Sequence, residues 1–179
     1  MVRRGPRSRA GRVLAAGLAI AAQLAGPSLS SAQQAAQPLT PVGQAAAQRG
    51  ISTCLPNIEL LARSVSESHD IGAYIFNQLD EADSNLVSVS MEVTPSPSGG
   101  PLYLSASFVP QPNGTCQVMV ESVLAWASDC APVGLAYPGY RITGKLLGEI
   151  RTLAASGPER LFLMPTPSGC VSIEKSVYF

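Results

Sequence analysis

Two runs of alternating apolar and polar residues, joined by a turn, form the clearest pattern in this chain. Residues 102–108 place apolar side chains at every second position, and residues 116–120 do the same. This period of two is typical of strands that bury one face. Between the runs, Asn113-Gly114 supplies residues that tolerate positive φ at a bend. We therefore expect a β-hairpin from Leu102 to Trp126.

Three further segments have the composition of strands. Residues 86–93 alternate cleanly, and residues 160–164 and 170–179 flank a turn rich in Pro, Ser and Gly. In the last run Val171, Ile173, Val177 and Phe179 share one face. These patterns predict about five strands in all.

Helical spacing of apolar residues occurs in three places. A first helix is expected after Pro56, and a second over residues 71–79 with Asp70 as its N-cap, although Gly72 weakens this second prediction. A third is expected from Thr143 to Ala154, ahead of Gly157-Pro158. Residues 127–140, rich in Pro and Gly, are expected to be a long loop.

The order helix, helix, three strands, helix, two strands indicates the α+β class. Because alternating strands cover only one face, we expect a mostly antiparallel sheet of about five strands, with two to three helices packed on its apolar side. Small binding and chaperone folds have a similar order of elements, but likeness at this level does not carry function.

The N-terminal region has the composition of an export signal. Five arginines lie in the first twelve residues, an apolar run follows to about Ala25, and small residues end at Ala32. We expect residues 1–32 to be a secretory signal peptide, residues 33–50 a flexible leader rich in Gln, Ala and Pro, and residues 51–179 a single disulfide-stabilised domain. The apolar run is too short for a stable membrane span.

Removal of the signal peptide would make the net charge of the protein negative. The whole chain carries 12 Lys+Arg and 12 Asp+Glu, and loss of the five leading arginines leaves a net charge near −5. The remaining basic residues are scattered along the chain. This distribution argues against nucleic acid as a partner.

Four cysteines, an even number, suit an exported chain with two disulfides. They are Cys54, Cys116, Cys130 and Cys170. Three pairings are possible. Because Cys116 and Cys170 both open a strand after a turn, we favour their pairing with each other, which leaves Cys54 to join Cys130. Zinc is disfavoured by the spacing, and neither a metal nor a cofactor is expected.

The best candidate for a binding surface is the loop at residues 127–140. Tyr137 and Tyr140 flank a Pro-Gly turn close after Trp126. Tyrosines on a rigid turn offer contact area at low entropic cost, but the same rings could instead pack against the tryptophan and seal the core.

Other candidate sites have plainer interpretations. His69-Asp70 could serve a hydrolase with Ser66 or Ser68 as nucleophile, but no nucleophile motif is present. The acidic run at residues 80–85 lacks the pattern of an EF-hand calcium loop, and Asn113-Gly114-Thr115 serves a hairpin turn as well as it would a glycosylation signal.

Taken together, these features predict an exported bacterial protein, periplasmic or secreted. We expect a non-enzymatic binding, accessory or inhibitor-like role with a protein or small-molecule partner in the cell envelope. The alternative is a small periplasmic hydrolase that uses His69.

Overall fold

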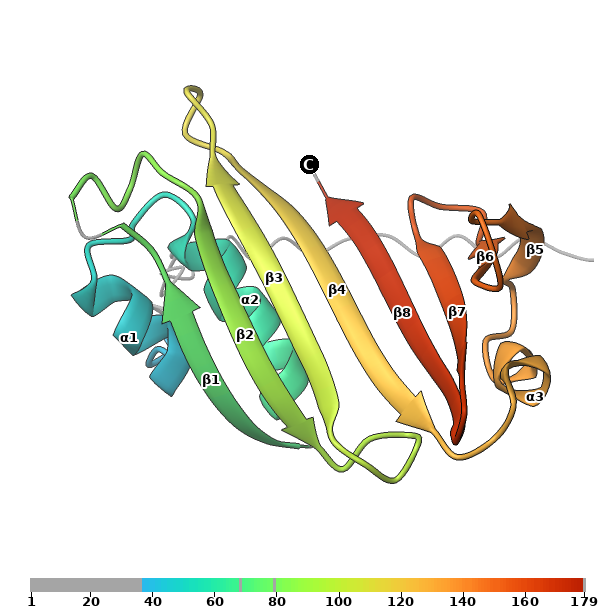
Figure 1. Ribbon diagram of the computed structural model, residues 1–179. Helices are drawn as coiled ribbons and strands as arrows, with labels where there is room; N and C mark the ends of the chain where they lie inside the picture. The colour runs from blue at the N-terminus through green and yellow to red at the C-terminus, as the bar shows by residue number, and fades with distance from the viewer. Residues whose placement is uncertain (1–36, 68, 79, 179) are drawn as a thin grey trace, which may run out of the picture. The chain divides into compact units, whose positions relative to one another are not determined.

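Eight strands form one antiparallel sheet in the order β1-β2-β3-β4-β8-β7-β6-β5 (Figure 1). The computed structural model describes residues 37–67, 69–78 and 80–178. The expected signal peptide, residues 1–32, lies outside them. The strands are β1 (Asp70–Phe76), β2 (Val87–Thr94), β3 (Leu102–Pro110), β4 (Cys116–Trp126), β5 (Arg141–Lys145), β6 (Arg151–Ala154), β7 (Arg160–Thr166) and β8 (Gly169–Tyr178).

The predicted central hairpin is confirmed. Strands β3 and β4 pair from Tyr103 opposite Val123 to Pro110 opposite Cys116, and the turn between them contains Gly114 with a φ of 79°. The alternation is also confirmed, because Leu104, Ala106 and Phe108 are all buried. An antiparallel sheet with a few helices is therefore correct, but five strands was an underestimate.

Helices α1 (Pro41–Gln48) and α2 (Leu55–Ser66) lie together behind β1, β2 and β3 (Figure 1). The short helix α3 (Cys130–Leu135) contacts β7 and β8. By the strand register, the side chains beneath α3 belong to the same face of the sheet as those beneath α2. In the described part of the chain, the opposite face, here called the open face, carries no helix.

The second expected helix, residues 71–79, is wrong, because residues 70–76 form β1. Ile75 is buried against the helices, while Tyr74 and Phe76 are exposed on the open face. The spacing of Ile71, Tyr74 and Ile75 fits a helix, but the same residues fit a strand equally well once β2 lies beside them to complete their hydrogen bonds.

The third expected helix, residues 143–154, is also wrong. Its residues form the hairpin of β5 and β6, with Ile142 opposite Leu153 and a turn closed by a 2.9 Å bond from the Leu146 amide to the Ile150 carbonyl. Leu153 is buried, whereas Leu146 and Leu147 lie in the turn and are exposed. The apolar residues that suggested a helical face therefore point in several directions.

The flexible leader expected at residues 33–50 instead contributes helix α1. Thr40 caps this helix by accepting a 3.1 Å bond from the Gly43 amide, and its own amide and hydroxyl donate to the Glu59 carboxylate of α2. Val42 and Ala46 are buried in the main core. Alanine-rich sequence is weakly apolar but strongly helical, so packing against α2 and β1 is enough to order it. The compact unit accordingly begins at Gln37 rather than at Ile51.

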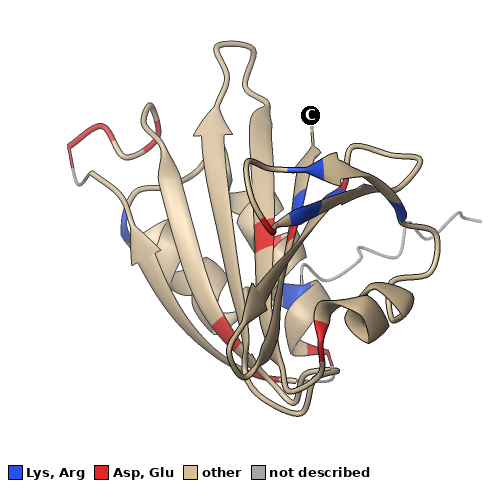
Figure 2. Ribbon diagram, turned by 45° about the vertical axis from the view of Figure 1, so that its right-hand side comes forward, with Lys and Arg blue, Asp and Glu red and all other residues tan. Residues whose placement is uncertain are grey.

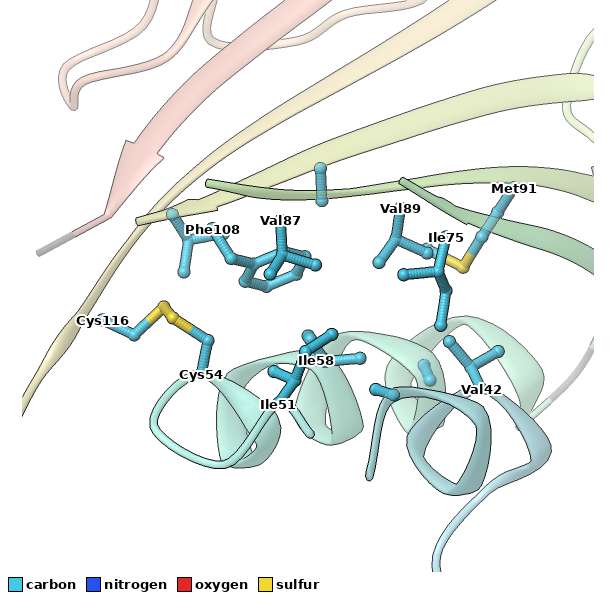
Figure 3. Packing of buried hydrophobic residues seen from close by; sticks show 14 of the residues in the cluster. Val42, Ile51, Cys54, Ile58, Ile75, Val87, Val89, Met91, Phe108 and Cys116 are labelled. Atoms are coloured by element: carbon cyan, nitrogen blue, oxygen red, sulfur yellow. A yellow bond between two sulfur atoms is a disulfide. The ribbon is translucent and has the colours of Figure 1, made fainter. Parts of the chain in front are cut away.

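The main core lies between the first four strands and helices α1 and α2 (Figure 3). Ile51, Ile58, Val87 and Phe108 are almost completely buried there. A second cluster forms beneath α3, where Val133, Leu153, Leu161 and Leu163 pack beside Trp126, Tyr137 and Tyr140.

Two disulfides are confirmed, but the favoured pairing is wrong. The bonds join Cys54 to Cys116 and Cys130 to Cys170. Strands β4 and β8 are antiparallel neighbours, so Cys116 at the start of β4 and Cys170 at the start of β8 lie at opposite ends of the sheet. Each disulfide ties a helix to the sheet, and closing loops of 62 and 40 residues contributes about 4 kcal/mol each in the chain-entropy model.

Strand β8 departs from the expected packing. Val171, Ile173 and Val177 do share a face, but it is the open face. Ser172 and Glu174 point toward α3 instead, and Ser172 is only 1% exposed. The helices therefore cover a partly polar stripe of the sheet here, and hydrogen bonds replace apolar packing. Phe179 lies outside the described residues.

Candidate functional site

The structure brings together the three aromatic residues singled out from the sequence. The Trp126 and Tyr137 rings lie 6.3 Å apart and the Tyr137 and Tyr140 rings 6.0 Å apart, both edge to face. The Trp126 indole N–H donates a 2.8 Å hydrogen bond to Ser172 Oγ, and the Tyr137 hydroxyl lies 2.8 Å from the same oxygen. The Tyr140 hydroxyl donates to the Glu174 carboxylate.

Both tyrosines stay neutral in this environment. Burial raises the pKa of Tyr137 above its usual value and is the largest influence. The hydrogen bond with Ser172 opposes this rise, and the nearby Glu174 charge, the smallest of the three influences, adds to it. Burial also raises the pKa of Tyr140, and its hydrogen bond to Glu174 acts in the same direction. Neither phenol is suited to act as a base. The polar ends of both rings are used inside the domain, which is the arrangement of a structural cluster; their role in binding stays a prediction.

The His69 pair does not form a catalytic arrangement among the described residues. His69 Nδ1 lies 3.1 Å from the Val65 carbonyl oxygen, and the Ser66 hydroxyl donates to the Arg63 carbonyl. Asp70 opens strand β1 as an exposed residue, with no hydrogen bond to the imidazole. Ser68 lies outside the described residues.

Asp83 links the acidic run at residues 80–85 to the segment that precedes α2. Its carboxylate accepts hydrogen bonds from the amides and hydroxyls of Ser52 and Thr53, just before α2. The hydrogen bond from the Ser52 hydroxyl is the largest influence on this group, and the bonds together lower the pKa of Asp83 to about 2 against the opposing effect of burial. Across residues 37–178, apart from Ser68 and Leu79, no group of three or more His, Cys, Asp or Glu side chains is placed to hold a metal ion.

Asn113 is also used locally. Its side-chain oxygen accepts bonds from the Thr115 amide at 3.1 Å and the Thr115 hydroxyl at 2.7 Å. These contacts hold the β3–β4 turn.

An exposed surface lies along β1, where the spacing of apolar residues predicts a helix. Among the residues that the structure describes, this strand is at the edge of the sheet, with β2 on one side of its backbone and no strand on the other. A hollow of about 190 Å³, here called the edge groove, runs between β1 and helix α1. The edge groove is lined by Pro41, Val42, Ala45, Ile71, Ala73 and Ile75.

A second, wider hollow of about 610 Å³ lies at the end of β1 and is here called the β1 cleft. It is lined by Arg49, Tyr74, Ile75, Phe76, Asn77, Gln78, Asn85, Leu86 and Ser88. Tyr74 and Phe76 are both more than half exposed, with ring centroids 4.7 Å apart. Arg49 donates to the Ile75 carbonyl at 2.9 Å and to the Asn77 side-chain oxygen at 3.3 Å.

A signal for this surface was present in the sequence. Residues 71–76 are rich in β-branched and aromatic residues, and their alternation gives one side of isoleucines and alanine and another with exposed aromatic rings. A strand ending in two exposed aromatic side chains is a candidate for binding, because large apolar groups are seldom left uncovered in a cluster without a function.

None of the helices in the described residues has the length and apolar character needed to cross a membrane. Comparison with known proteins leaves the surface along β1 to be interpreted from its own geometry: no family model matches the chain, and neither a curated protein nor a solved structure is significantly similar to it.

Proposed function

We propose that the protein is an exported, non-enzymatic binding protein that takes up an extended basic segment of another protein as an additional strand beside β1. The observation that carries this proposal is the edge groove beside β1, a strand that pairs with β2 on one side and, among the described residues, with no strand on the other. In this mode of recognition, main-chain hydrogen bonds supply affinity and pockets for alternate side chains supply specificity.

The hydrogen bond from Arg49 indicates which backbone groups of β1 face away from β2. It reaches the Ile75 carbonyl, which places the backbone groups of this residue on the side away from β2. Backbone direction alternates along a strand, so the amides and carbonyls of Ile71 and Ala73 point the same way. Arg49 covers one end of the edge, and within the described residues no strand pairs with the outer side of the beginning and middle of β1, where an incoming strand could add.

The side chains on the two faces favour different residues in the ligand. On the helix side, the edge groove is apolar and suits small branched side chains. On the open face, Tyr74 and Phe76 present rings that attract cations, and Glu92 lies opposite Gly72 in the neighbouring strand.

Carboxylates surround β1 more widely. Asp70 begins the strand, and the acidic loop of residues 80–83 follows it, as Figure 2 shows at the left of the sheet. Residues 37–126 contain eight Asp+Glu but only two Lys+Arg. Charge complementarity therefore favours a ligand that alternates valine-like residues with lysine or arginine.

The binding test uses a fluorescent peptide of alternating Lys and Val. We expect it to bind, and a Glu/Val peptide of the same length to bind at least tenfold more weakly. Replacing Ala73 by proline removes the outward amide, and edge strands tolerate proline when this amide faces solvent. Ala73→Pro should therefore weaken binding at least tenfold without unfolding the domain.

Ala73→Ser retains the amide and is the matched control, with fluorescence anisotropy for binding and a denaturant midpoint for folding. Equal binding by the parent and a folded Ala73→Pro variant would contradict the proposal. A parent protein that is a dimer, and that Ala73→Pro makes monomeric, would identify the occupant as a second copy and would also overturn it.

A further inference from the structure

The hairpin of β5 and β6 carries a second exposed apolar surface, far from β1 in the strand order. Leu147 at its turn is fully exposed and Leu146 is half exposed. Ile142 on β5 is 66% exposed, and Leu135 on the adjoining helix α3 is 84% exposed. Ile142 and Leu135 line one shallow hollow, so the apolar surface continues from the hairpin onto α3.

Basic residues accompany these leucines. Lys145 lies directly opposite Arg151 across the hairpin, and Arg141 begins β5. Among the described residues, none of the three forms an ion pair within 4.0 Å. Like charges directly opposite one another destabilise a strand pair. This local cost is understandable if the two cations meet an anion outside the domain.

We propose that the β5–β6 hairpin docks onto an anionic lipid surface. The exposed leucines would enter the boundary between headgroups and acyl chains, while Lys145 and Arg151, the cross-strand pair nearest the turn, contact lipid phosphates. Long basic side chains suit this position, because their apolar stems lie along the leucines and their charged ends reach the headgroups.

The charge distribution of the whole domain gives this contact an orientation. Residues 141–151 contain three Lys+Arg against the single Glu149, whereas residues 37–126 have a net charge of −6. Figure 2 shows basic positions on the β5–β6 arm and acidic positions in the loop after β1. An anionic surface attracts the hairpin and repels the β1 end, which leaves the edge groove accessible.

A lipid surface fits better than an acidic protein. The leucines stand at the tip of a turn rather than in a recess, and a fully exposed tip is suited to insertion into a soft interface. The inference is independent of the peptide proposal, because it concerns different strands and a different class of partner.

The test is sedimentation with vesicles of phosphatidylcholine alone or mixed with phosphatidylglycerol. The protein is purified in the form that an expressing bacterium exports, and all variants share the same N-terminal residues, so differences between them report on the substituted side chains. We expect binding to the anionic vesicles only, with release at high salt.

Two double variants test the apolar and the electrostatic contributions to vesicle binding separately. The double variant Leu146→Ser, Leu147→Ser should reduce vesicle binding at least tenfold, and Lys145→Glu with Arg151→Glu should abolish it. The matched control is Leu60→Ser, because Leu60 is 69% exposed on α2, in the acidic part of the domain. This control should bind as the parent does.

Several results would overturn the inference. One is a parent protein that does not bind anionic vesicles. The others are folded leucine variants that bind the vesicles as well as the parent does, or a Leu60→Ser variant that loses as much binding as the leucine double variant. If the parent does not bind vesicles but captures an acidic protein, and the hairpin variants lose this capture, the surface would be assigned to protein recognition instead.

Discussion

Ser172 holds the aromatic cluster together, and its removal should measurably destabilise the domain. The residue is 1% exposed, and its hydroxyl is the common partner of the Trp126 indole N–H and the Tyr137 hydroxyl, each at 2.8 Å. Ser172→Ala removes both hydrogen bonds and leaves two polar groups without their partner. Alanine keeps the Cβ of Ser172 but has no oxygen, so it can bond neither to the indole N–H nor to the Tyr137 hydroxyl.

The magnitude follows from the burial of the two partners. A hydrogen bond contributes about 0.5 to 1.5 kcal/mol net, and a buried group left unsatisfied costs about 1 to 3 kcal/mol. Trp126 and Tyr137 are both half-buried, so water can reach them in part and the lower values apply. We expect Ser172→Ala to lower the free energy of unfolding by about 2 kcal/mol, or Tm by about 4 to 8 °C for a chain of this size.

Urea denaturation followed by tryptophan fluorescence measures this effect directly, because Trp126 is the only tryptophan in the chain. The matched control is Ser176→Ala, a buried serine two positions before the end of β8. The aromatic rings form their hydrogen bonds with Ser172 and Glu174 instead, so this control should change stability by less than about 0.5 kcal/mol. Tyr137→Phe should cost about 1 kcal/mol, and combined with Ser172→Ala it should cost less than the sum. Unchanged stability of Ser172→Ala, or an equal loss in the Ser176 control, would refute the reasoning.

Two further predictions concern backbone and charge. Gly169→Ala should destabilise the domain by about 2 to 5 kcal/mol, because a Cβ there would overlap the Trp126 carbonyl oxygen and because φ at this residue is 149°. The control Gly100→Ala should be nearly neutral in the same urea titration, since a Cβ at Gly100 meets nothing within 4 Å. Asp83→Asn should be less stable than the parent above pH 4. The folded pKa of Asp83, about 2, lies below the ordinary value for an aspartate, so the ionised carboxylate favours the folded state. As pH falls from 4 to 2 the difference in unfolding midpoint should narrow; a constant difference would show that the charge is not what stabilises the loop.

The sequence determined those parts of the protein whose pattern and partner lie close together in the chain. The β3–β4 hairpin could be predicted because period-two alternation and an Asn-Gly turn are local properties, and each strand supplies the other's hydrogen bonds. Helix α2 followed from a proline at its start and a regular apolar face. An even number of cysteines, in a chain expected to be exported, was enough to predict two disulfides, but not their pairing.

Tertiary structure decided the elements whose local pattern was ambiguous. Residues 71–76 fit a helix or a strand, and β2 resolves the choice by pairing with them. Residues 143–154 have the same ambiguity. Within this segment only Leu153 is buried, and this depends on the position of β7 beside β6. Helix α1 depends on the Glu59 carboxylate and on the surface of β1, contacts that an Ala- and Gln-rich sequence cannot reveal.

The candidate site was the least predictable feature for the same reason. Tyr137, Tyr140 and Trp126 were correctly grouped by their closeness in sequence, but the buried Ser172 that binds two of them comes from a strand about forty residues away. Whether β1 is an edge depends on the order of all eight strands, and this order is set by pairings between residues far apart in the chain. The sequence therefore determined which residues alternate and which can bend, while the strand order decided which backbone remains free to bind.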